Sequence, residues 1–112
     1  MILICGLPRS GKTTLSMKYD NVLHLDQIGS YPGINLLVKP DSVVDGVYET
    51  RRIREFLIKA AKADRNICIW MNTDLEIIEK RGNKYWLYFE PPTLEEGWDE
   101  IIVLQGKEDN NE

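Results

Sequence analysis

The sequence predicts an α/β domain in which helices cover both faces of a mainly parallel sheet of about five strands. Five short apolar runs alternate with helical or turn-rich stretches, as repeated strand–helix–strand units do. With 112 residues, 43% of them hydrophobic, the chain has the size of one ordinary domain. A domain this short buries a smaller share of its surface than a large one, so we expect few insertions. The expected strands are 2–5, 21–25, 42–44, 67–71 and 101–104.

Helical composition fills the gaps between these runs. Residues 12–19 and 50–63 are expected helices, and a third is expected to begin at Thr73, because Glu76 three residues later completes a capping-box pattern. The second helix has an apolar stripe at i, i+3 and i+4 spacing that we expect in the core: Ile53, Phe56, Leu57, Ala60 and Ala61. We expect one domain over residues 1–106, followed by a disordered acidic tail at 107–112 that has no apolar residue to bury.

The most specific signal is the segment GLPRSGKT at residues 6–13, which fits G-x-x-x-x-G-K-[ST] between a strand-like and a helix-like run. Its glycines let backbone N–H groups face phosphates, and the following helix adds its positive end. Lys12 is expected to reach the β- and γ-phosphates, and Thr13 to bind Mg²⁺ through its hydroxyl. The pattern predicts a P-loop NTPase three-layer sandwich. The expected nucleotide-binding residues are Gly6, Leu7, Pro8, Arg9, Ser10, Gly11, Lys12, Thr13 and Thr14.

Two aspartates follow expected strands. Ligands of such folds lie at the carboxyl ends of the parallel strands, so we expect Asp26 and Asp45 beside the phosphates. Asp26 could accept a proton from an attacking hydroxyl, and Asp45 could hold Mg²⁺ or orient the substrate. Each could instead cap a helix or form a turn. His24 is expected to be a structural residue, as lone histidines often are.

Charge and cysteine content limit the classes of function. A formal net charge of −4 argues against a protein that coats nucleic acid, because that affinity comes from many Lys and Arg contacts with phosphate. Cys5 and Cys68 lie within apolar runs, where we expect buried free thiols. The first apolar run is too short for a signal peptide or a membrane span. We therefore expect a cytoplasmic protein without membrane contact.

Five segments together resemble the kinase module of polynucleotide 5′-hydroxyl kinases: residues 6–14, 24–30, 44–46, 50–54 and 88–98. The resemblance implies transfer of the γ-phosphoryl group of ATP, with Mg²⁺, to a 5′-OH end of DNA or RNA. It assigns the general base to Asp26 and metal binding to Asp45. Glu95 and Glu96, in the last segment, are expected to face water.

The family resemblance also points to cationic residues. Arg51, Arg52 and Arg54 open a helix near where the family's substrate strand approaches, and they could bind a substrate phosphate or form a solvated face balanced by nearby glutamates. The net negative charge favours short or single-stranded ends. The family's lid is reduced to about residues 79–84, with Arg81 as its catalytic charge. A second subunit or another partner could complete this lid.

Two other functions remain open at this point. Kinases of small hydroxyl compounds, such as nucleosides or sugars, share the loop and the base. An ATP-binding or ATPase module without transfer activity, completed by or signalling to a partner, would keep the loop alone.

Overall fold

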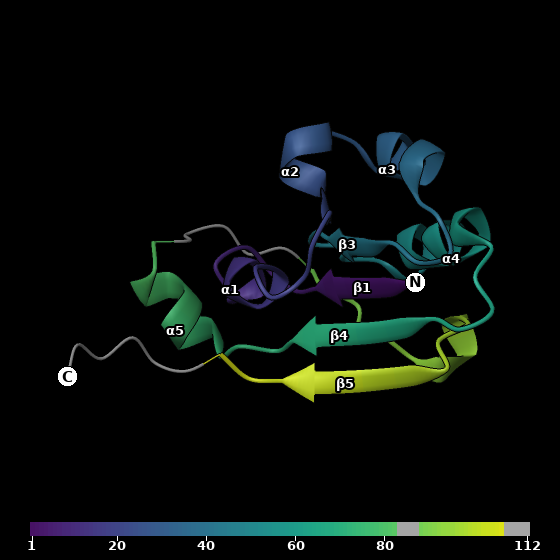
Figure 1. Cartoon of the computed structure of the whole chain (residues 1–112). Helices are drawn as coiled ribbons and strands as arrows, with labels where there is room; N and C mark the ends of the chain where they lie inside the picture. The colour runs from purple at the N-terminus through teal and green to yellow at the C-terminus, as the bar shows by residue number, and fades with distance from the viewer. Residues whose placement is uncertain (83–87, 107–112) are drawn as a thin grey trace.

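The computed structural model describes residues 1–82 and 88–106, which form an α/β fold around a five-stranded parallel sheet (Figure 1). The sheet order is β2-β3-β1-β4-β5, and every pairing is parallel. The predicted α/β class with a parallel sheet and all five predicted strands are confirmed, and the assignment to P-loop NTPases stays a prediction. The strands are β1 (Ile2–Cys5), β2 (Leu23–His24), β3 (Val43–Asp45), β4 (Ile67–Met71) and β5 (Glu100–Leu104).

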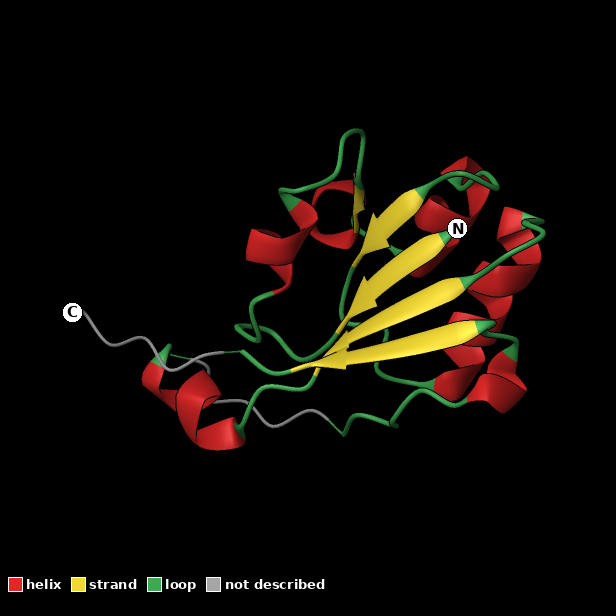
Figure 2. Ribbon diagram, turned by 60° about the horizontal axis from the view of Figure 1, so that its bottom comes forward, coloured by secondary structure: helices red, strands yellow, loops and turns green. Residues whose placement is uncertain are grey.

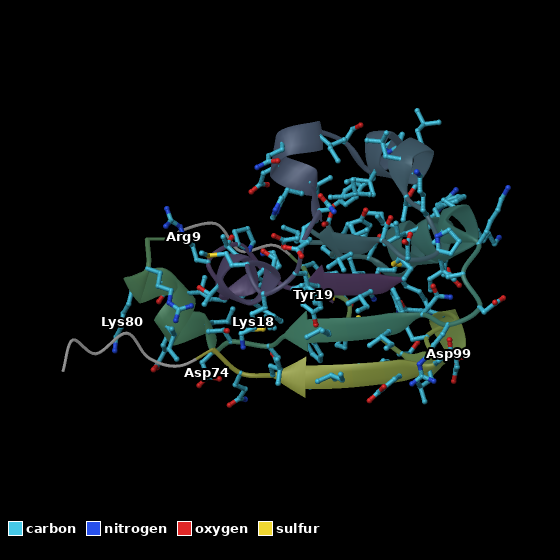
Figure 3. All side chains as sticks on the ribbon, viewed as in Figure 1. Arg9, Lys18, Tyr19, Asp74, Lys80 and Asp99 are labelled. Atoms are coloured by element: carbon cyan, nitrogen blue, oxygen red, sulfur yellow. The ribbon has the colours of Figure 1, made fainter. Side chains whose placement is uncertain are left out.

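Short helices connect the strands, and all strands point their carboxyl ends toward the same edge of the sheet (Figure 2). That edge lies toward Arg9, whereas Asp99 lies at the opposite end of the sheet (Figure 3). The helices are α1 (Lys12–Ser16), α2 (Leu25–Ile28), α3 (Tyr31–Leu37), α4 (Arg51–Ala61) and α5 (Leu75–Lys80), with a 3₁₀ turn η1 (Leu94–Glu96).

Both faces of the sheet contribute to an apolar core, as parallel sheets require. One cluster joins β1, β3 and β4 to α3 and α4, and includes the fully buried Leu3 and Leu57. The other includes Ile4 and Ile69, with Leu15 of α1 packed against them. The described residues contain no helix long and apolar enough to cross a membrane.

The two cysteines are buried free thiols, as predicted. Cys5 Sγ lies 3.5 Å from Cys68 Sγ, between neighbouring strands β1 and β4. The hydrogen bond to Cys5, together with burial, raises the pKa of the Cys68 thiol. Both side chains therefore pack in the core as small apolar groups, one on β1 and one on β4.

Helix α4 packs the predicted apolar stripe against the core except at Phe56, because Leu57 and Ala61 are buried and Ile53 and Ala60 pack against the core cluster. The Thr50 hydroxyl caps its start by accepting from the Ile53 N–H at 3.3 Å. Arg54, Leu57 and Ala61 are the buried residues of this helix, whereas Phe56 is 50% exposed. The prediction that Phe56 lies in the core is wrong: its ring is on the exposed side of the helix, with the Arg52 guanidinium 5.7 Å from its centre.

Arg54 forms a closed ion pair with Glu96 of η1, and neither side chain is exposed. Arg54 Nε donates to Glu96 Oε1 at 2.6 Å, and Nη2 donates to Oε2 at 3.1 Å. Other guanidinium N–H groups donate to the carbonyls of Tyr48 and Glu90. The expectation that Glu96 faces water is wrong, because its carboxylate joins α4 to the segment before β5.

Thr73 precedes α5 without capping it. The N-cap residue is Asp74, and the capping box predicted between Thr73 and Glu76 is absent. The Thr73 hydroxyl instead donates to the Ser10 carbonyl at 2.5 Å and accepts from the Gly106 N–H at 2.9 Å. The side chain therefore joins the ends of β4 and β5 to the loop that follows β1.

Candidate functional site

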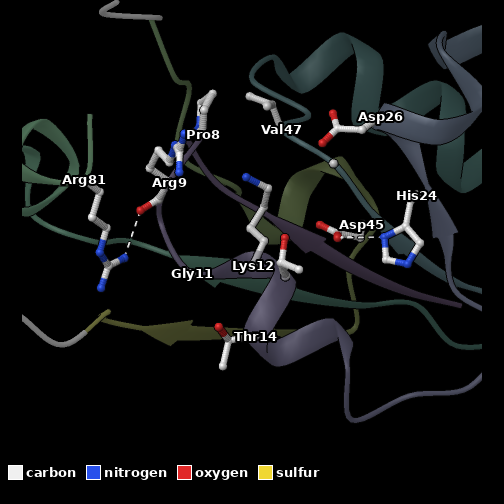
Figure 4. A pocket seen from close by; sticks show the side chains of 12 residues that line it. Pro8, Arg9, Gly11, Lys12, Thr14, His24, Asp26, Asp45, Val47 and Arg81 are labelled. Carbon is white, nitrogen blue, oxygen red and sulfur yellow. Dashed lines mark hydrogen bonds and ion pairs between the residues drawn. The ribbon is translucent and has the colours of Figure 1, made fainter. Parts of the chain in front are cut away.

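A cavity of about 620 Å³ lies at the carboxyl ends of β1, β2 and β3 (Figure 4). The connection from β1 passes β3 to reach β2, whereas the connection from β3 passes β1 to reach β4, so these neighbouring strands connect in opposite directions. In α/β folds, ligands bind in the crevice beside the strand ends at such a reversal. We call this cavity the first hollow. It is lined by Pro8, Arg9, Gly11, Lys12, Thr13, Thr14, His24, Asp26, Asp45, Gly46, Val47 and Arg81.

The loop of residues 6–11 curls around one side of the first hollow. Gly6, Arg9 and Gly11 have φ angles of 148°, 67° and 106°. A Cβ on Gly6 would lie 2.7 Å from the Met71 carbonyl oxygen, so only glycine fits there. Gly11 precedes α1 and offers no capping side chain, so the first N–H groups of the helix have no side-chain acceptor at the N-cap.

Neighbouring elements hold this loop from outside. The Ser10 carbonyl accepts from Thr73, and the Arg9 carbonyl accepts from Arg81 Nη1 at 2.9 Å. Ser10 is fully buried, and its hydroxyl has no partner within the part of the chain that the structure describes. The loop is thus fixed through its carbonyl groups to α5 and to the end of β4.

Lys12 begins α1 and lies inside the curl of the loop. Its Nζ donates to the Leu7 carbonyl at 2.9 Å. Burial lowers the pKa of this ammonium below its ordinary value, and the charges of Asp45 and Asp26 oppose that shift. Lys12 is thus a partly desolvated cation, and its positive charge is the feature of this site that can attract an anionic ligand.

Asp45 ends β3 and is only 7% exposed. His24 Nδ1 lies 3.1 Å from Asp45 Oδ2, and both side chains line the first hollow (Figure 4). In the tautomer with hydrogen on Nδ1, the imidazole donates to this carboxylate oxygen. The structure places His24 in the wall of the first hollow, and the expectation that it is a structural residue stays untested. The strand register could have revealed its contact with Asp45, because β2 and β3 pair these two residues.

Asp26 lies in the first turn of α2, one residue after that helix begins at Leu25. Its side chain is exposed and lines the first hollow. The structure thus brings Asp26 to the same cavity as Lys12 and Asp45, and its role as a base stays a prediction.

The donor groups of this cavity suit Mg²⁺. Thr13 offers a hydroxyl and Asp45 a carboxylate, and Mg²⁺ in phosphate-transfer sites takes one or two such ligands together with phosphates and water. Residues 1–82 and 88–106 contain no group of three or more His, Cys, Asp or Glu side chains placed to bind a metal on their own. Thr13 and Asp45 therefore fit a metal that enters with a phosphate ligand.

The three predicted substrate-binding arginines do not line this cavity. Arg54 is fully enclosed by its ion pair, so its assignment to the substrate is wrong. Arg51 Nη2 donates to Thr93 Oγ1 at 3.0 Å, and the Arg52 guanidinium lies 5.7 Å from the Phe56 ring. Acceptor contacts by Arg51 and Arg52 stay predictions without support from this geometry.

Arg81 follows α5 and lines the first hollow, as a cation at the phosphates should. Residues 83 and 84 of the predicted short lid lie outside the described residues, as does the predicted acidic tail.

Neither the family models nor the curated proteins compared with this chain gave a match. The fold is similar to the unliganded crystal structure of a sugar kinase from Janibacter sp. HTCC2649, with a TM-score of 0.64. Sequence identity is 17%, and the match covers 93% of this chain and 83% of that chain. At this identity, the similarity shows that the two chains share a fold.

Proposed function

We propose that this chain is an ATP- and Mg²⁺-dependent kinase that phosphorylates a hydroxyl group of a small compound. One observation carries the proposal: Lys12, Thr13, Asp26 and Asp45, from three different strand ends, line one cavity. This set supplies a cation for phosphates, oxygen ligands for Mg²⁺ and a carboxylate base, which are the recurring parts of phosphoryl transfer.

Transfer in this site would be an in-line displacement. The acceptor oxygen forms a bond to the γ-phosphorus of ATP while the bond from that phosphorus to the β,γ-bridging oxygen breaks, and ADP leaves. The acceptor proton moves to the Asp26 carboxylate and then to water. Lys12 exchanges the Leu7 carbonyl for phosphate oxygens, and Arg81 adds positive charge. Thr13 and Asp45 would hold Mg²⁺, which neutralises phosphate charge when bound.

The enclosed arginine favours a small acceptor over a nucleic acid end. With Arg54 in a closed ion pair and Arg51 bonded to Thr93, the helix start offers less charge to a polynucleotide backbone than the sequence suggests. The similar structure is also of a protein named as a sugar kinase. The 5′-OH ends of short or single-stranded DNA or RNA are the second candidate acceptors, supported by the sequence resemblance. An ATP-binding module without transfer is the third reading.

One assay separates these functions. Radiolabelled ATP is incubated with Mg²⁺ and, in parallel, with sugars, nucleosides, 5′-OH oligonucleotides or buffer alone. The proposal expects label on a sugar or nucleoside. Label only on oligonucleotides would favour the second candidate, and label only in inorganic phosphate, or no release of label, would favour the third.

Lys12→Ala tests the nucleotide site on which all three readings depend. The lysine charge contributes to binding, so the thermal stabilisation by Mg-ATP should be lost in this variant. Lys18→Ala is the matched control, because Lys18 is exposed and lies after α1, outside the first hollow (Figure 3). A wild-type shift in Lys12→Ala would remove the nucleotide assignment.

A further inference from the structure

A second cavity, of about 420 Å³, adjoins the first hollow on the side of α1 and β2. We call it the second hollow. The two cavities share four lining residues: Thr13, His24, Asp26 and Asp45. The shared wall thus contains the proposed base and the proposed metal ligands, so a molecule in either cavity would meet the same reactive groups.

The two hollows differ in charge. The first contains the cations Arg9, Lys12 and Arg81. The second has no lysine or arginine among its described lining residues, and Asp26 and Asp45 give it negative charge. Its remaining lining residues are Ser16, Met17, Tyr19, Asn21, Val22 and Gln27. A polyphosphate is thus attracted to the first hollow, whereas a phosphate-bearing compound would be repelled from the second.

The neutral side chains of the second hollow suit hydroxyl groups. Gln27, in α2, and Asn21, in the turn before β2, each offer one amide carbonyl acceptor and two N–H donors. A hydroxyl group both donates and accepts, so amides and carboxylates can pair with several hydroxyls of one ligand. The Met17 and Val22 side chains add apolar surface for its carbon atoms.

We propose that the second hollow is the acceptor site and that the acceptor is an uncharged polyhydroxylated compound, such as a free sugar or a polyol. This inference rests on the proposed kinase function. The acceptor hydroxyl beside Asp26 gives its proton to that carboxylate, and its oxygen bonds to the γ-phosphorus of ATP in the first hollow as ADP leaves. Arg9, Lys12 and Arg81 then contact only the nucleotide. The second hollow selects an acceptor that carries no charge.

The first test is direct binding to the wild-type chain without nucleotide, measured by ligand-observed NMR. The probes are D-glucose, D-ribose, xylitol and glycerol, with glucose 6-phosphate and a 5′-OH oligonucleotide as charged counterparts. Because the cations of the first hollow could bind any phosphate, each titration is repeated with excess Mg-ADP to fill that cavity. With Mg-ADP present, we expect at least one uncharged probe to bind and the charged counterparts not to bind. In that titration, absence of binding by all four uncharged probes, or preferred binding of a charged one, would overturn the proposal.

Two variants test whether the probe binds in the second hollow. Gln27→Ala removes one amide, and Asn21→Gly removes the other while accepting the backbone φ of 55° at that position. Each should raise the KM for the bound probe about three- to tenfold, the usual effect of one lost hydrogen bond, and should leave the KM for ATP unchanged. Asn72→Ala is the control, because Asn72 is an exposed amide that lines neither hollow.

The outcomes separate this inference from the function on which it rests. If Mg-ATP stabilises the wild-type chain and transfer occurs, but neither variant changes the acceptor KM, then the acceptor binds elsewhere and only this inference fails. If Mg-ATP does not stabilise the wild-type chain, the proposed kinase function itself fails. A loss of ATP binding in Gln27→Ala would also count against the inference, because it would place that residue at the nucleotide.

Discussion

Two buried carboxylates pair with a basic side chain in this fold, and they differ in how completely their partners enclose them. Glu96 accepts from Arg54, from the Thr93 N–H at 2.9 Å and from Trp98 Nε1 at 3.2 Å. Neither the Glu96 nor the Arg54 side chain has exposed surface. Asp45 pairs with His24, whose side chain is 30% exposed, and it borders two cavities.

The difference separates an enclosed pair from one that a ligand can reach. A buried ion pair is tolerable only when further hydrogen bonds satisfy both groups, and Glu96 and Arg54 meet this condition. Such a pair cannot exchange its partners without unfolding its surroundings. Asp45 keeps open space beside its carboxylate, so a metal ion or substrate can reach it. The burial of a charge therefore indicates function here only where the partners leave room for a ligand.

The largest effect should come from breaking the closed pair. Glu96→Gln leaves the Arg54 charge buried without its counter-ion, and such a loss costs about 3–5 kcal/mol of unfolding free energy. Urea denaturation followed by circular dichroism measures it. Glu95→Gln is the control and should change stability little, because the Glu95 side chain is 88% exposed. A Glu96→Gln midpoint equal to that of the control would contradict the enclosed pair.

The same pair makes stability depend on pH. Burial favours a higher pKa for Glu96, but hydrogen bonds from Arg54 and the Thr93 N–H outweigh burial and hold the pKa below the ordinary 4.5. The lowered pKa stabilises the fold above pH 4.5, and this contribution is lost as pH falls through the folded-state pKa. The stability difference between wild type and Glu96→Gln should therefore shrink below pH 4.5. A constant difference would contradict the lowered pKa.

Asp26 is the exposed carboxylate of the site, and its substitution should alter chemistry without altering stability. Asp26→Asn should lower transfer by about 10² or more, the usual effect of losing a general base, with nucleotide affinity nearly intact. The measurement is initial rate against acceptor concentration, together with the thermal shift by Mg-ATP. Asp20→Asn, at an exposed position outside both hollows, is the control. Transfer at the wild-type rate would make Asp26 structural.

Changing His24, the partner of Asp45, should weaken the affinity of the site for Mg²⁺. His24→Leu removes the donor that orients Asp45, and losing the partner of a metal ligand typically weakens metal affinity about 10- to 100-fold. His24→Asn should restore most of it, because the amide nitrogen takes the place of Nδ1. The readout is the Mg²⁺ concentration that gives half-maximal stabilisation by ATP. Equal values in wild type and His24→Leu would show that the imidazole does not position Asp45.

The strands, the loop after β1 and the positions of the two aspartates could be predicted, because each depends on residues close together in the sequence. The apolar runs predicted all five strands, and the glycine spacing of residues 6–13 predicted a curled loop between β1 and α1. Asp26 and Asp45 were predicted at the strand ends because parallel strands place their carboxyl ends together. These predictions needed no knowledge of distant contacts.

The predictions that failed concern side chains whose partners are distant in sequence. Arg54 is 42 positions from Glu96, and Thr73 is 63 positions from Ser10. A basic residue in a helix start resembles a solvent-facing or ligand-binding one until its carboxylate partner is known. The contact of His24 with Asp45, 21 positions away, was not predicted either, because only the register between β2 and β3 brings them together. Tertiary pairing, which a single sequence does not show, decided each case.

The smallest effect is expected at Arg51, and it distinguishes the two acceptor classes. The Arg51 side chain is 43% exposed and pairs with Glu95 at 3.4 Å, so Arg51→Ala should cost less than about 1 kcal/mol of stability. It lines neither hollow, so the KM for an uncharged acceptor should not change. If the acceptor were a polynucleotide end, losing a phosphate contact would raise its KM and flatten the salt dependence of binding. Measuring the KM for a sugar and for a 5′-OH oligonucleotide at two salt concentrations, in wild type and Arg51→Ala, therefore gives opposite results for the two classes.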